Sequence, residues 1–141
     1  MRSKHSSNGI RVARAAIDAV VAHARSAAPD ECCGLLLGAG DSVVDARPAR
    51  NAAEAASRRF VVDPKDHIDG RRDARARGIE VVGFYHSHPR SPARPSQTDL
   101  EQASYDDHLY LIVGLAAEPP EVALFRLERG NFLAVPFVTV G

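Results

Sequence analysis

Short apolar segments bounded by glycine or proline recur along this chain, and they restrict the folds that it can adopt. This pattern predicts strands at residues 10–12, 33–37, 42–47, 60–62, 79–85, 109–113, 122–127 and 132–138. Helical spacing, a proline at a first turn or a capping pattern predicts helices over residues 14–27, 64–77 and 96–105. Because these helices do not alternate regularly with the strands, we expect a mixed sheet flanked by helices, in the α/β class.

The length of the chain bounds its domain organisation. A chain of 141 residues predicts one domain, which buries enough surface to fold without a metal or a disulfide. We assign this domain to residues 9–141 and expect the polar residues 1–8 to form a disordered tail. Hydrophobic residues make up 45% of the chain and charged residues 26%, which is the balance of an ordinary soluble protein.

The charge and the apolar runs argue against several classes of function. Basic and acidic residues number 18 each, and this balance argues against a nucleic-acid binder or a protein of anionic membranes. The longest apolar run, residues 109–117, is far shorter than the roughly 20 residues of a membrane span. Residues 1–9 contain no hydrophobic segment of the kind found in secretory signals. Because the only cysteines, Cys32 and Cys33, are neighbours, we expect reduced, buried thiols in a cytoplasmic protein.

The most informative stretch of the sequence is His86-Ser87-His88-Pro89, which follows the strand predicted at 79–85. Side chains two residues apart in a strand point to the same face, so His86 and His88 could ligate one metal ion. Asp99 comes eleven residues after His88, beyond a proline-rich loop that is long enough to fold back. Two imidazoles and one carboxylate leave a tetrahedral zinc ion one open position, which marks a catalytic site.

Hydrolysis at such a zinc ion needs two further groups. Zinc lowers the pKa of a bound water towards about 7, and a base must move the proton to the leaving amine. Glu31 is the best candidate, provided that the strand at 33–37 pairs beside the strand at 79–85. Ser96 is the candidate donor to the oxyanion of a tetrahedral intermediate.

Each of these residues also has an ordinary structural explanation. A His-x-His pair by itself is weak evidence for a metal, and Glu31 by itself is an exposed carboxylate. Ser96 followed by Asp99 fits a helix N-cap with an acidic first turn, which stabilises a helix without any chemistry. That explanation is compatible with metal binding, because the start of a helix would hold Asp99 in place. The donor set also suits iron(II), so the choice of metal stays open.

Taken together, these residues resemble the signature of the JAMM/MPN+ metalloproteases. Glu31 is followed by His86-x-His88, then seven residues, Ser96, two residues and Asp99. The segments at 29–35 and 83–89 resemble those around the family's catalytic glutamate and metal ligands, and Asn51 and the stretch at 60–64 fit less specifically. The resemblance covers nearly the whole chain after residue 9. The length resembles that of the small, stand-alone prokaryotic members.

The resemblance implies a cytidine-deaminase-like α/β fold, the JAMM/MPN fold, with a curved mixed sheet between helices. It implies one zinc ion per chain held by His86, His88 and Asp99, with Glu31 as general acid/base and Ser96 as oxyanion stabiliser. Family enzymes hydrolyse peptide or isopeptide bonds after the C-terminal Gly-Gly of ubiquitin-like proteins, and small prokaryotic relatives act on sulfur-carrier proteins. The expected partner is therefore a ubiquitin-like or sulfur-carrier protein with a Gly-Gly tail.

Two alternatives to this function remain open. The same enzyme class could serve conjugate or precursor processing in antiphage defence, which the neighbouring genes would reveal. A non-catalytic MPN-type scaffold would only bind a partner. Such relatives lack a metal ligand or the glutamate, whereas all five positions are present here. The sequence leaves open the leaving group, the pathway and the oligomeric state.

Overall fold

The computed structural model describes residues 9–141, so the tail predicted at 1–8 lies outside the described residues. The strands and helices are, in chain order, β1 (Ile10–Ala13), α1 (Arg14–Ala27), β2 (Cys33–Ala39), β3 (Ser42–Ala49), α2 (Pro64–Ala76), β4 (Glu80–His88), α3 (Gln97–Gln102), β5 (Leu109–Gly114), β6 (Glu121–Glu128), β7 (Asn131–Ala134) and β8 (Phe137–Val140). Within this part of the chain, the strands form one mixed sheet in the order β7-β6-β5-β4-β2-β3-β1-β8. The predicted mixed α/β class is confirmed.

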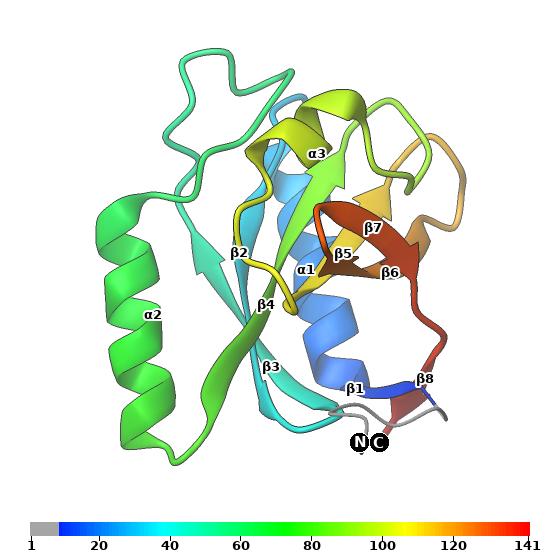
Figure 1. Cartoon of the computed structure of the whole chain (residues 1–141). Coiled ribbons are helices and arrows are strands. Elements are labelled where there is room, and N and C mark those ends of the chain that lie inside the picture. Colours follow the sequence, from blue (N-terminus) through cyan, green and yellow to red (C-terminus); the bar gives the residue numbers. More distant parts are fainter. Residues whose placement is uncertain (1–8) are drawn as a thin grey trace.

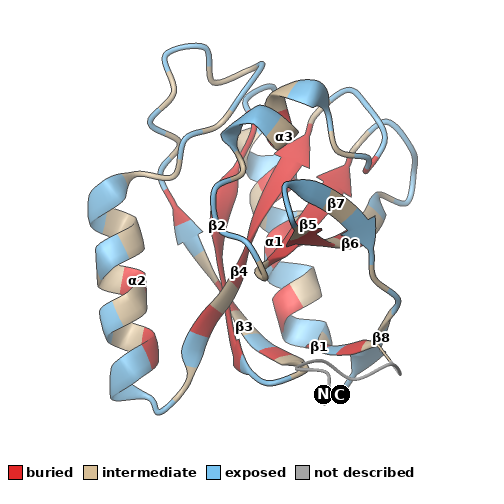
Figure 2. Ribbon diagram, in the orientation of Figure 1, coloured by how far each residue is buried: buried red, intermediate tan, exposed pale blue. Residues whose placement is uncertain are grey.

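The sheet is curled and is covered by helices on both faces (Figure 1). On one face, Val20 of α1 belongs to the same core cluster as Leu36 and Tyr85. On the other face, Ala74 of α2 shares a cluster with Leu35. Figure 2 shows that the central strands β2, β4 and β5 are almost wholly buried, which explains their continuous apolar runs. No helix within residues 9–141 has the length and hydropathy needed to cross a membrane.

The pairing of β2 with β4 positions the part of the molecule that carries the histidines. The two strands are antiparallel, with Cys33 opposite His86 and Gly34 opposite Tyr85. Gly34 is needed for this close approach, since a Cβ atom there would lie 2.2 Å from the Tyr85 ring. The prediction for Glu31 depended on this pairing. It places the residues just before β2 beside the end of β4.

The structure differs from the predicted elements at four places. Residues 60–62 do not form a strand, and only Val62 makes an isolated bridge, to Asn51. The strand predicted at 132–138 is divided into β7 and β8 at Pro136, which cannot donate to a sheet ladder. β4 extends through His88, and α3 is shorter than predicted. The two histidines therefore lie at the end of a central strand, as the sequence predicts.

Candidate metal centre

Two different elements bring His86, His88 and Asp99 together. His86 and His88 are buried at the end of β4, which is held by β2 on one side and β5 on the other. Asp99 lies in the first turn of α3, where Ser96 and Asp99 form a capping box. The Asp99 Oδ2 atom lies 3.2 Å from His86 Nε2 and 3.0 Å from His88 Nε2. The two Nε2 atoms are 3.3 Å apart, so three potential ligand atoms converge on one point.

The protonation states of these groups suit a divalent cation. Burial lowers the pKa of His86, so its imidazole is neutral and keeps a lone pair. Burial opposes a charge on Asp99, yet the adjacent His86 and His88 side chains lower the pKa of Asp99 and keep it ionised. The His88 Nδ1 atom lies 3.0 Å from the Pro92 carbonyl oxygen, to which Nδ1–H donates, and this tautomer leaves Nε2 free to ligate. Burial opposes a charge on His88, yet its hydrogen bond to Asp99 raises the pKa of His88, so a cation binding at Nε2 would displace a proton. The residues therefore fit a zinc ion, with one Nε2 atom from each imidazole and one carboxylate.

Glu31 lies beside this cluster, as the sequence predicts. The Cys32 N–H donates to the Ser87 Oγ atom at 2.8 Å, and the Ser87 N–H donates to the Cys32 carbonyl at 3.2 Å. These bonds fix the backbone next to Glu31 against β4. Burial raises the pKa of the Glu31 carboxyl to about 7. The charges on His88 and Asp99 have smaller effects: His88 lowers this pKa and Asp99 raises it. A carboxyl group with this pKa can both accept and release a proton near neutral pH.

Ser96 has the structural role that the capping pattern predicts. Its Oγ atom accepts a hydrogen bond from the Asp99 N–H at 3.0 Å, while the Ser96 N–H donates to Asp99 Oδ2 at 2.8 Å. The Ser96 hydroxyl uses only its acceptor capacity in this cap, so its O–H is left to donate elsewhere. Capping and donation to an oxyanion are therefore compatible in one side chain.

The segment between β3 and α2 supplies two residues, Asn51 and Phe60, to which the sequence assigns no role at this site. The Phe60 ring stacks on the His86 imidazole, with 4.3 Å between centroids and 20° between planes. Asn51 fixes this segment through its side-chain amide. Its Nδ2 atom donates to the carbonyls of Glu31 and Arg59, each at 3.0 Å, and its Oδ1 atom accepts from the Ala53 and Val61 N–H groups. In the sequence, Asn51 appeared only as a less specific part of the family resemblance.

We expect Asn51→Ala to destabilise the protein by about 2–4 kcal/mol, because four hydrogen bonds are lost and partly buried backbone groups lose their partners. Urea denaturation of the two proteins measures this difference in the free energy of unfolding. Asn131→Ala is the matched control, since the exposed Asn131 side chain makes one hydrogen bond of 3.4 Å. Equal stability of the Asn51→Ala and Asn131→Ala proteins would contradict this account of the segment.

Within residues 9–141, the other histidines and both cysteines lie outside the cluster. Among residues 9–141, His86, His88 and Asp99 form the one group of three such side chains that could hold a metal ion. Both cysteines are free and buried, and the Cys33 Sγ atom points to backbone carbonyls of residues 49 and 50. His23 of α1 is half-buried, and its Nδ1 atom lies 2.7 Å from the Tyr85 hydroxyl.

A curled mixed sheet that carries a buried His-His-Asp cluster defines the JAB/MPN class of metallopeptidase fold. The solved structures agree. A protein from Desulfitobacterium hafniense has a TM-score of 0.84 and 32% identity, covering 93% of this chain and 92% of that one. A JAB1/MPN domain protein from Archaeoglobus fulgidus has a TM-score of 0.64 and 22% identity, covering 96% of this chain and 100% of that one. The second likeness concerns the fold alone.

Comparison with protein families assigns the chain more closely. The model of the prokaryotic homologs of the JAB domain matches residues 13–128. Desampylase of Haloferax volcanii is 38% identical over 75% of this chain and 81% of its own length. CysO-cysteine peptidase of Mycobacterium tuberculosis is 35% identical over 69% of this chain and 67% of its own length. A probable TtuB-protein conjugate cleaving protease of Thermus thermophilus is 30% identical over 88% of this chain and 80% of its own length. The chain belongs to the prokaryotic JAB-domain family and is a metallopeptidase of the JAMM type.

Removal of metal is expected to leave the fold intact. The two core clusters contain the apolar side chains of both sheet faces and do not include His86, His88 or Asp99. A chain of this size also buries enough surface without a metal. Far-ultraviolet circular dichroism before and after addition of a chelator checks this expectation. A large loss of signal would show that the metal has a structural role.

Proposed function

We propose that this chain hydrolyses the peptide or isopeptide bond after the C-terminal Gly-Gly of a ubiquitin-like or sulfur-carrier protein. The observation that carries the proposal is the convergence of His86 Nε2, His88 Nε2 and Asp99 Oδ2 beside a carboxyl group whose pKa is about 7. In this proposal those three residues hold one zinc ion per chain. Two reduced cysteines are consistent with a cytoplasmic protein.

Zinc at this site would act as a Lewis acid, polarising the scissile carbonyl and lowering the pKa of water. The chain's own residues handle the protons. The Glu31 carboxylate takes a proton from the attacking water and delivers it to the nitrogen of the departing amine. The Ser96 O–H donates to the oxyanion while its Oγ atom continues to accept from the Asp99 N–H. His88 is kept in its ligating tautomer by the Pro92 carbonyl.

The relatives support the substrate class. Their names describe a desampylase, a peptidase of CysO-cysteine and a probable protease of TtuB-protein conjugates. The last two names describe cleavage of an adduct or a conjugate of another protein. The JAMM/MPN+ signature adds that the family's target bond follows a Gly-Gly tail. Two glycines suit a narrow path past the cluster, because an extended tail without side chains can approach a strand closely.

The experiment combines metal analysis with cleavage. The purified protein is assayed for bound zinc and then mixed with the host's own Gly-Gly-ended carrier fused to a short C-terminal extension. Intact mass identifies the products, with and without a chelator. We expect about one zinc ion per chain and chelator-sensitive cleavage directly after Gly-Gly. A protein that binds no zinc and cuts none of the host's carriers would instead be a scaffold that only binds a partner.

A further inference from the structure

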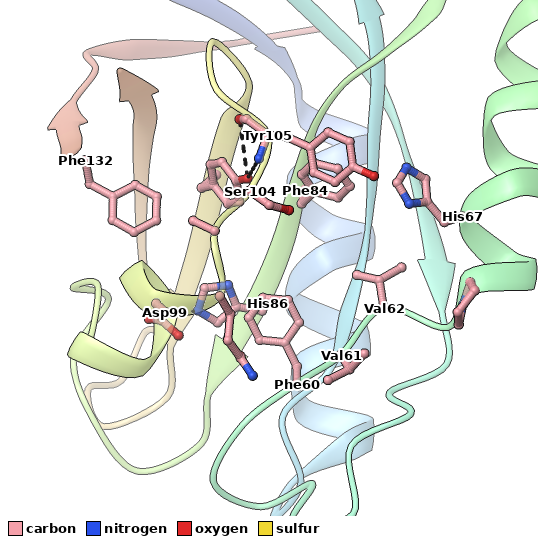
Figure 3. Close-up of a pocket in the computed structure, with 14 residues that line it drawn as sticks. Phe60, Val61, Val62, His67, Phe84, His86, Asp99, Ser104, Tyr105 and Phe132 are labelled. Atoms are coloured by element: carbon pink, nitrogen blue, oxygen red, sulfur yellow. Dashed lines mark hydrogen bonds and ion pairs between the residues drawn. The ribbon is translucent and has the colours of Figure 1, made fainter. Parts of the chain in front are cut away.

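An apolar pocket adjoins the candidate metal centre. It has a volume of about 490 Å³, and His86 and Asp99 form part of its wall. Figure 3 shows these two residues at one end and the aromatic rings of Phe84, Tyr105 and Phe132 at the other. The volume is within the range of small-ligand sites, about 300–1,000 Å³, and such sites are lined mostly by apolar side chains. The mechanism proposed above uses only the end of the pocket at His86 and Asp99.

The position of Glu31 indicates which part of a substrate this pocket faces. A group that protonates the departing amine must lie within hydrogen-bond reach of that amine. β2 and β4 are antiparallel with Cys33 opposite His86, so Glu31, two residues before Cys33, lies towards the His88 end of β4 and away from Phe84. The leaving group therefore belongs on the side of the centre where Glu31 lies. The pocket, on the other side, faces the acyl part of the substrate, which is the tail that ends in Gly-Gly.

The length of the pocket along β4 indicates which residue of the substrate tail would reach its aromatic end. His86 and Phe84 both line the pocket and are two residues apart in β4, which corresponds to about 7 Å along the strand. Two glycines of an extended tail span the same distance, at roughly 3.3–3.6 Å per residue. With the scissile carbonyl beside His86, the first residue before the Gly-Gly pair lies level with Phe84.

The aromatic rings at the Phe84 end of the pocket pack against one another and form an apolar surface. The Phe84 centroid lies 5.1 Å from that of Tyr105 and 5.6 Å from that of Tyr110, and Phe132 packs edge-on against Tyr110 at 5.2 Å. Tyr105 is 40% exposed, so the end is accessible from solvent. The Arg71 guanidinium lies 5.4 Å from the Tyr105 ring centroid and helps to hold that ring. Such a surface favours a leucine-sized or aromatic side chain over a polar one.

We propose that this pocket binds the apolar side chain of the residue immediately before the Gly-Gly pair of the substrate tail. This inference rests on the proposed function and deepens it, because it states what the enzyme requires upstream of the two glycines. Specificity then has two parts. The proposed cleavage site follows two glycines, and the pocket selects one apolar side chain before them. A tail with serine or aspartate at that position would leave the aromatic end without a partner.

Binding of labelled peptides tests the inference without depending on catalysis. The probes are fluorescein-labelled peptides that end in Leu-Gly-Gly, in Ser-Gly-Gly, or in Leu-Ser-Gly-Gly, where the leucine is one residue further upstream. Fluorescence anisotropy measures their affinities for the whole chain, both with zinc and with a chelator. We expect Leu-Gly-Gly to bind at least about tenfold more tightly than the other two, since pocket contacts of this size discriminate by roughly 10–200-fold. Equal affinities, or a preference for the upstream leucine, would overturn the inference.

Variants of the pocket show whether it is the source of the preference. Phe132→Ala and Tyr105→Ala each remove one ring, and the Tyr105 backbone hydrogen bonds to Tyr110 do not depend on the side chain that is removed. We expect both variants to reduce the Leu-to-Ser affinity ratio severalfold. Leu133→Ala is the matched control, because Leu133 follows Phe132 in β7, is 48% exposed and is not part of the pocket wall. A ratio that is unchanged in both pocket variants would also overturn the inference.

Cleavage assays separate this inference from the proposed function. Carriers that end in Leu-Gly-Gly or Ser-Gly-Gly before a short extension are compared by their kcat/KM values. If both are cut at equal rates, the proposed function holds and the inference fails. If neither is cut, the proposed function fails for these carriers, and the peptide affinities alone decide the inference. We expect both to be cut, with the leucine carrier favoured at least about tenfold.

Discussion

The Asp99→Ala protein is expected to carry almost no zinc and to cut no carrier, whereas we expect the unchanged protein to carry about one zinc ion per chain. The Asp99 Oδ2 atom is the one atom that both histidine Nε2 atoms contact, at 3.2 and 3.0 Å. Without it, two neutral imidazoles remain, and catalytic zinc sites ordinarily use three protein ligands. Elemental analysis of protein purified with zinc, together with the carrier assay, measures both losses.

This substitution also removes part of a helix cap, so it needs a control that separates the two effects. Asp99 Oδ2 accepts the Ser96 N–H in the capping box of α3. Asp63→Ala is matched to it, because the Asp63 side chain caps α2 by accepting from the Asp66 N–H and lies outside the metal cluster. We expect Asp63→Ala to lower stability by about 1 kcal/mol and to keep its zinc. Unchanged zinc content in the Asp99→Ala protein would contradict the proposed ligand set.

The parts of this site that depend on local geometry could be predicted from the sequence. His86 and His88 share a face because side chains alternate along a strand, and the capping pattern of Ser96 with Asp99 requires only one turn of helix. The place of Glu31 required a further condition, the pairing of two particular strands. The sequence predicts both strands but does not say that they are neighbours. The structure supplies that pairing, with Cys33 opposite His86.

Other features could not be predicted because they depend on contacts between distant segments. The apolar residues 60–62 predict a short strand. In the structure the same residues line the pocket beside the candidate metal centre, and Phe60 stacks on His86. Asn51 is one of many polar residues in the sequence, yet its amide links the Glu31 carbonyl to the segment that carries Phe60. No local pattern distinguishes such a residue.

The pKa of Glu31 is also a property of the folded chain, and it leads to the second large effect. We expect Glu31→Gln to keep its zinc and to lose roughly 10²–10⁴-fold in kcat, the range for removal of a general acid–base group. Glutamine has nearly the same shape but cannot carry the proton from water to the amine. Zinc analysis and single-turnover cleavage measure the two properties separately. Glu54→Gln is the control, since Glu54 is exposed in the segment after β3.

The same substitution should stabilise the metal-free protein, and only above a certain pH. Burial raises the pKa of Glu31 from 4.5 to about 7 in the folded chain. Between these values the unfolded chain has released the proton while the folded chain still holds it, so stability falls as pH rises. We therefore expect Glu31→Gln to gain up to about 3 kcal/mol near pH 8 and nothing near pH 4. Urea denaturation with a chelator measures this difference.

A gain of the same size at both pH values would assign the effect to the shape of the side chain and not to its charge. A gain in stability confined to high pH and the loss in kcat would both follow from the position of the Glu31 carboxyl group. The fold buries the Glu31 carboxylate, which makes its charge unfavourable and raises its pKa to about 7. With this pKa the group can exchange a proton near neutral pH. Glu54→Gln, whose side chain is exposed, should change neither the rate nor the pH dependence of stability.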